Sequence, residues 1–163
     1  MDDQVFFAQH DNVFVFKLVG NIRFTICPGV EQFLQKLFAE QAMCPIIVDM
    51  TETTGIDSTA LGLLAQMAMH SRKELDLKPT LLVVPGDVLT VIKSMSFDTV
   101  FSIVQEADAA TGAFTEIHPV DVGEKDMIGH ILAAHRTLMG LSDENRGKFE
   151  NVLKVLEKEM DGD

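Results

Sequence analysis

Basic residues are scarce in this chain, and so are the segments that mark secreted or membrane-inserted proteins. The 13 Lys and Arg side chains stand against 25 Asp and Glu, which gives a formal net charge of −12. An acidic surface repels phosphate groups, so we expect neither nucleic acid nor an anionic membrane as a partner. No apolar run approaches the roughly 20 residues that cross a bilayer. The N-terminus, Met1-Asp2-Asp3, is acidic, whereas a secretory signal starts with basic residues. We therefore expect a cytoplasmic protein.

Cysteine is also rare. Cys27 and Cys44 are the two in the sequence, and they stand far apart with no Cys-x-x-Cys spacing. In a cytoplasmic chain such isolated cysteines are more often free thiols than partners in a disulfide. We predict that both are free.

The motifs of the common enzyme classes are missing. The sequence has no phosphate-binding Walker loop, no Gly-x-Gly-x-x-Gly, no Gly-x-Ser-x-Gly elbow and no Cys-x-x-Cys pair. His130 and His135 are five residues apart, so they do not share a helix face as two metal ligands spaced by four would. We predict no metal, no cofactor and no enzymatic activity, and we interpret His135 as a structural histidine near a helix end.

The residues that are present indicate a globular α/β domain. Apolar residues make up 47% of the chain and charged residues 23%, which is typical of a folded protein. Strand-like alternation and helix-like apolar stripes follow one another in the order β-β-α-β-α-β-α-β. The expected strands are residues 5–9, 13–19, 46–50, 81–84 and 100–104, and the expected helices begin at residues 28, 58 and 88. Such alternation predicts a sheet with mostly parallel inner strands, covered by helices.

The pattern changes after residue 106. Residues 107–122 carry scattered glycine, proline and charge, which indicates a linker or an irregular connection. Residues 123–163 contain two amphipathic segments separated by Gly140 and Ser142, as in a helical hairpin. We thus expect an α/β domain over residues 1–106 and a C-terminal helical extension over 123–163. The extension either packs on the domain or on itself, or it docks a partner or a second copy.

The most informative segment connects the strand at residues 46–50 to the next helix. It ends the strand at Asp49, continues through a loop at 51–56, and then reads Asp57-Ser58-Thr59-Ala-Leu-Gly. Serine is a preferred N-cap, so a structural role for Ser58 is one interpretation. The other is phosphorylation, because a helix N-terminus carries partial positive charge that favours a phosphate.

This motif resembles the phosphorylation-site motif of STAS domains, the anti-sigma-factor antagonists. The strand ending in Val19-Gly20, the helix from Pro28 and the strand Leu82-Val83-Val84 follow in the order of that family. The resemblance covers roughly residues 5–106 and implies a STAS-type small mixed sheet covered by helices, with the C-terminal helical hairpin as an addition.

The resemblance also implies a function. In that family the serine of Asp-Ser is phosphorylated by an anti-sigma factor with serine kinase activity, and a PP2C-type phosphatase removes the phosphate. The phosphoacceptor would be Ser58, with Thr59 a weaker candidate. Asp57 would be its acidic neighbour, and Asp49 a carboxylate that organises the following loop. The unphosphorylated form would bind its partner in bacterial partner switching.

Two questions stay open at this level. Leu63 and Met67 lie off the inner stripe of the helix from Ser58, so they are either core residues or, with Asp57, Ser58 and Thr59, part of a partner-binding surface. The protein itself could alternatively be a constitutive scaffold or sensor subunit whose STAS domain is never phosphorylated, or a small-ligand-binding domain. A further regulatory protein could bind through the C-terminal helices.

Overall fold

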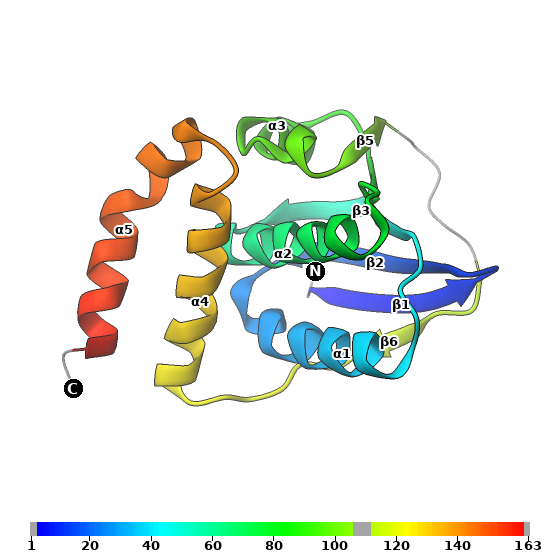
Figure 1. Ribbon diagram of the computed structural model, residues 1–163, viewed down its shortest axis with the longest axis horizontal. Helices are drawn as coiled ribbons and strands as arrows, with labels where there is room; N and C mark the ends of the chain where they lie inside the picture. The colour runs from blue at the N-terminus through cyan, green and yellow to red at the C-terminus, as the bar shows by residue number, and fades with distance from the viewer. Residues whose placement is uncertain (1–2, 106–111, 162–163) are drawn as a thin grey trace.

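The alternating segments of the chain fold into one six-stranded sheet with helices packed against it (Figure 1). The computed structural model describes residues 3–105 and 112–161. Its strands are β1 (Gln4–His10), β2 (Val13–Ile22), β3 (Ile46–Ile56), β4 (Thr80–Val83), β5 (Ser102–Gln105) and β6 (Thr115–Ile117). Its helices are α1 (Cys27–Glu40), α2 (Ser58–Leu75), α3 (Asp87–Ser94), α4 (Glu124–Met139) and α5 (Asp143–Asp161), with 3₁₀ turns at Phe24–Ile26 and Phe97–Thr99.

The strand order across the sheet is β5-β4-β3-β2-β1-β6. Strands β2, β3, β4 and β5 run parallel to one another, which confirms the prediction of parallel inner strands. Strand β1 pairs antiparallel with β2 through a two-residue turn. Both turn residues, Asp11 and Asn12, have positive φ, and such turns match the right-handed twist of the strands they join.

The core lies between the sheet and the helices α1 and α2. Alternate residues of β2, including Phe16 and Leu18, point to one face and are almost completely buried. They meet Val30 of α1 and Leu64 of α2 around an apolar cavity of about 10 Å³. A cavity of that size is comparable to one water molecule, so it offers no room for a metabolite inside the core.

Two segments are more regular than the sequence indicated. Residues 51–56 were expected to be a loop, but β3 continues through them to Ile56 and stays paired with β2. Threonines at 51, 53 and 54 have high strand propensity, and their polarity made this stretch resemble a loop. In the segment 107–122, expected to be a linker or irregular connection, Thr115–Ile117 forms the edge strand β6 beside β1. Residues 107–111 lie outside the described residues.

The C-terminal segment forms the expected helical hairpin, and the hairpin packs on the domain. In Figure 1, α4 runs across the end of α2 where α2 begins, and α5 lies on the far side of α4. Leu138 of α4 and Phe149 of α5 belong to the same cluster of buried side chains as the sheet and α2. Of the two alternatives that the sequence left open, packing on the domain is therefore the one observed.

Two further expectations concern the membrane and the cysteines. None of the helices in the described part of the chain is both long and apolar enough to cross a membrane. Cys27 is buried and Cys44 partly buried, and both are free thiols, as predicted.

Candidate functional site

Helix α2 begins with a side-chain cap from Asp57, not from Ser58. Asp57 Oδ1 accepts a hydrogen bond from the backbone N–H of Ala60 at 2.9 Å. Its Oδ2 accepts from the backbone N–H of Phe24 at 2.7 Å, which ties the start of α2 to the segment after β2. The interpretation of Ser58 as the N-cap is therefore wrong, because Asp57 already satisfies the amide that a cap would reach.

Ser58 is the first residue of α2, and its hydroxyl is bonded to the C-terminal hairpin. Its Oγ lies 2.9 Å from Nε2 of His135 on α4, a residue 77 positions later in the chain. Ser58 is half-buried, whereas His135 is only 6% exposed. The imidazole stacks on the ring of Phe149 on α5, with ring centroids 5.1 Å apart. The hydroxyl of Ser58 thus faces an imidazole that both hairpin helices hold in place.

The neighbouring turns of α2 and α4 are in close contact. Residues 58, 62 and 66 are spaced by four and so share one face of α2. A Cβ atom added at Gly62 would lie 2.4 Å from the backbone oxygen of Ala134, too close for any real side chain. One turn further along, Gln66 Nε2 donates to Thr137 Oγ1 at 3.3 Å. Gly62 allows α4 to approach the backbone of α2 at the helix end that carries Ser58.

The imidazole of His135 is harder to protonate here than in water. Burial lowers the pKa of His135 from its ordinary value of 6.5, and the Asp57 carboxylate opposes this with a smaller effect. Its second ring nitrogen, Nδ1, is buried and has no hydrogen-bond partner among the residues that the structure describes. A buried polar atom without a partner is uncommon and costs free energy. The hydrogen bond to Ser58 is therefore the contact that fixes the polar edge of the ring.

We predict that the hairpin is less stable in acid for this reason. The unfolded chain takes up a proton on His135 as pH falls through about 6.5, whereas the folded chain takes it up at lower pH. Stability is then unaffected by this group above pH 7 and decreases as pH falls below 6.5. Urea unfolding at pH 7.5 and 5.5 should show a larger loss for the wild type than for His135→Gln, which keeps a hydrogen-bonding group but does not titrate. Equal losses in the two proteins would contradict the prediction.

Three of the residues that we assigned to a partner-binding surface are buried. Thr59 is 5%, Leu63 5% and Met67 2% exposed. Met67 lines the internal cavity together with β2, so it is a core residue. A partner cannot contact these side chains in this conformation, and their assignment to an exposed surface is wrong. Met69, two residues further along α2, is 49% exposed.

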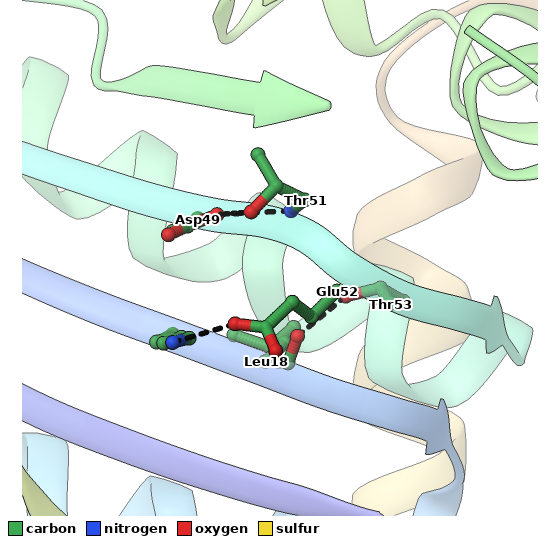
Figure 2. A network of polar contacts seen from close by, with 6 residues as sticks. Leu18, Asp49, Thr51, Glu52 and Thr53 are labelled. Carbon is green, nitrogen blue, oxygen red and sulfur yellow. Dashed lines mark hydrogen bonds and ion pairs between the residues drawn. The ribbon is translucent and has the colours of Figure 1, made fainter. Parts of the chain in front are cut away.

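Asp49 lies in the middle of a strand, so the interpretation that it organises a loop is also wrong. The pairing of β2 with β3 shifts register between Lys17↔Asp49 and Val19↔Glu52, so β3 has one extra residue there, as in a β-bulge. Asp49 Oδ1 accepts hydrogen bonds from both the backbone N–H and the hydroxyl of Thr51, at 2.9 and 2.7 Å (Figure 2). This completely buried carboxylate therefore supports the bulge that lets β3 continue towards α2.

Two further kinds of chemistry are relevant to this region, metal binding and attack by the thiol of Cys27. Among the described residues, no three His, Cys, Asp or Glu side chains are grouped so that they could hold a metal ion. Burial, with smaller contributions from Asp57, Glu31 and Asp3, raises the pKa of Cys27 to about 12. Its thiol is protonated at neutral pH and hence a poor nucleophile.

Comparison with protein families shows to which family the chain belongs. A model of the STAS domain matches residues 5–110, well over half of the chain, including the start of α2. The chain belongs to the STAS-domain family. STAS domains occur in anti-sigma-factor antagonists and related proteins, and they are generally protein-interaction domains without catalytic activity. The hairpin α4–α5 lies beyond the matched residues. A search of curated proteins finds no match.

His135 is the residue of this site that the sequence did not reveal. The sequence placed it on the buried stripe of a tail helix, among apolar residues, and we took it for a structural histidine. A polar side chain on an apolar stripe was the available signal. Its partner could not be inferred, because Ser58 lies in another part of the chain and no spacing rule links the two.

Proposed function

We propose that this STAS-domain protein is a phosphorylation-gated protein-interaction switch of the anti-sigma-factor-antagonist type. In this proposal the unphosphorylated protein binds an anti-sigma factor or a similar regulator in bacterial partner switching. A partner with serine kinase activity phosphorylates Ser58 and is released, and a PP2C-type phosphatase restores the binding form.

The observation that carries the proposal is the position of Ser58 in a STAS domain. It is the first residue of α2, directly after the capping Asp57, and its hydroxyl is not used in the cap. The first turn of a helix carries partial positive charge, so the local electrostatics of α2 favour a phosphate there. The same phosphate adds about −1.5 to −2 charges at pH 7 beside Asp57. Any protein surface that packs on this helix end would meet a strongly hydrated anion.

The proposal predicts one phosphate on Ser58. The purified protein is incubated with ATP and an extract of its native cells, and its intact mass is measured beside that of Ser58→Ala. We expect a gain of one phosphate in the wild type and none in the variant. Thr59→Ala, which keeps the serine, should be phosphorylated like the wild type. A phosphate that persists in Ser58→Ala, or no phosphate while a control substrate is modified, would rule out this site.

Partner binding gives an independent check on the same site. In a pull-down from the same extract, Ser58→Ala should retain the partner, whereas Ser58→Asp should lose it because the carboxylate adds charge to the helix end. Equally tight binding by both variants would argue against gating by phosphate.

A constitutive scaffold or sensor subunit is the second candidate. The half-burial of Ser58 and its hydrogen bond to His135 favour it, since a hydroxyl in such a position is harder for a kinase to reach. A scaffold of this kind would take up no phosphate and would tolerate Ser58→Asp in the pull-down.

A further inference from the structure

The helices outside the STAS match are in contact with the residue that the proposed function depends on. Three successive residues on one face of α2, namely Ser58, Gly62 and Gln66, each meet α4. Their contacts on α4 are His135, Ala134 and Thr137, and we call these six residues the α2–α4 contact. A kinase or a binding partner would have to approach Ser58 through it.

At Gly62 the α2–α4 contact has no spare volume. Even a methyl group at Gly62 would overlap backbone and side-chain atoms of Ala134, at 2.4 and 2.5 Å. A phosphoryl group on Ser58, one turn away, is larger than a methyl and needs water or donors around its oxygens. The hydroxyl of Ser58 is already hydrogen-bonded to the buried imidazole of His135, at 2.9 Å. A phosphate on Ser58 would have to displace the hydrogen bond to His135, so we expect phosphate transfer to require a movement of α4.

The hairpin is nevertheless attached by few buried side chains. Four residues are buried in the 16-residue α4, and two, Asn145 and Phe149, in the 19-residue α5. Segments with few buried apolar contacts open at lower free energy than the core of the same protein. We therefore expect the hairpin to separate from α2 at a lower free energy than that of global unfolding.

Polar contacts hold the two ends of the hairpin. His130 Nδ1 lies 2.6 Å from Glu31 Oε2 on α1, at the first half of α4. At the loop between α4 and α5, Asn145 Nδ2 donates to the backbone oxygens of Met95 and Leu138, at 2.8 and 2.9 Å. The side chains of His130 and Glu31 are half-buried, so closure depends on this contact as well as on Asn145, Leu138 and the stacked rings of His135 and Phe149.

We propose that the α4–α5 hairpin is an intramolecular cover of Ser58, and that reagents and proteins reach this side chain only when α4 moves away from α2. Its role as a regulator of phosphorylation rests on the proposed function. Where a protein must open before it binds, its apparent affinity is reduced by the fraction that is open. A partner or kinase that competes with α4 for α2 would thus bind more tightly to a protein whose hairpin is weakened.

Access to position 58 can be measured without knowing the kinase. Ser58→Cys is made in a Cys44→Ala background, and alkylation of the introduced thiol is followed by mass spectrometry with iodoacetamide and with a bulky polyethylene-glycol maleimide. The ratio of the two rates reports access, because a change in thiol pKa caused by the nearby imidazole affects both reagents. Cys27, 2% exposed and with a raised pKa, remains as an internal reporter that reacts only if the domain unfolds.

The substitutions that open the cover are made in the hairpin. The STAS domain, residues 5–110, then carries only the two substitutions of the parent, Ser58→Cys and Cys44→Ala. Ala134→Glu places a charged side chain against Gly62, and Val155→Glu adds the same group at a 63%-exposed position on α5. We expect Ala134→Glu to raise the ratio of the bulky reagent's rate to that of iodoacetamide at least about ten-fold, since α4 then no longer covers position 58, and Val155→Glu to leave this ratio within about two-fold of the parent. If Cys27 reacts in Ala134→Glu, Phe149→Ala replaces it, since it removes the ring that stacks on His135.

An equal ratio of the two alkylation rates in the parent and in the opened variant would overturn the cover. Failure of the proposed function gives a different result, because no phosphate would then appear in the extract while the alkylation rates still differ. Equal rates of Ser58 phosphorylation in the wild type and Ala134→Glu, together with different alkylation rates, would overturn the regulatory role and leave both the phosphosite and the cover intact.

Discussion

Removing the C-terminal hairpin is expected to lower the melting temperature of the domain strongly. A chain ending at Val122 loses Leu138 and Phe149, which are packed into the common core, and exposes the side of α2 that α4 covers. Each fully buried large apolar side chain contributes about 1.5–3 kcal/mol. A loss of about 3 kcal/mol or more corresponds to a decrease in Tm on the order of 10 °C for a chain of this size. Calorimetry of the two chains measures it.

A shorter truncation is the matched control. A chain ending at Lys154 loses only the last turns of α5, where side chains are mostly exposed, and keeps Phe149. Its Tm should stay within a few degrees of the full chain, because exposed ion pairs such as Arg136–Glu157 contribute little. An unchanged Tm for the chain ending at Val122 would show that the hairpin does not stabilise the domain, and the packing described here would be wrong.

Substituting Gly62 by alanine is expected to destabilise the protein, although alanine is the better helix former. Intrinsic propensity alone would favour Gly62→Ala by about 1 kcal/mol in the interior of a helix. The added methyl would lie 2.4 Å from the backbone oxygen of Ala134, and a backbone atom cannot be displaced without moving α4. Forcing extra volume into a packed contact costs about 1–3 kcal/mol. Urea unfolding should show a lower midpoint than the wild type.

The same substitution at Gly147 is expected to have the opposite effect on stability. It lies inside α5, is exposed, and a Cβ there meets no atom within 4 Å. Gly147→Ala should therefore stabilise the protein by up to about 1 kcal/mol through helix propensity. The gain in helix propensity is common to both substitutions, so the two Gly→Ala variants should differ by the cost of overpacking at Gly62, about 1–3 kcal/mol. Stabilisation by both would show that α4 does not press on Gly62.

Local patterns were enough to predict much of the STAS fold. The alternation of Phe14, Phe16 and Leu18 with Val15 and Lys17 predicted β2, because side chains on a strand point to opposite faces in turn. The apolar stripes of α1 and α2 and the buried runs of β3 and β4 followed from the same kind of local period. Predictions were weaker where a polar segment lacked a period. The extension of β3 to Ile56 is such a case, because its pairing with β2 includes a bulge.

For the candidate site too, local sequence patterns predicted some features and the tertiary contacts decided the others. The sequence alone determined that Ser58 follows an acidic residue at the start of a helix in a STAS-type motif, because those residues are adjacent in the chain. The tertiary structure decided what surrounds it: Asp57 takes the cap, Leu63 and Met67 enter the core, and His135 lies against the hydroxyl. These contacts join residues up to 77 positions apart. The contact between Ser58 and His135 depends on how α2 and α4 cross, which the close approach of Gly62 and Ala134 allows, and not on any period readable along one segment.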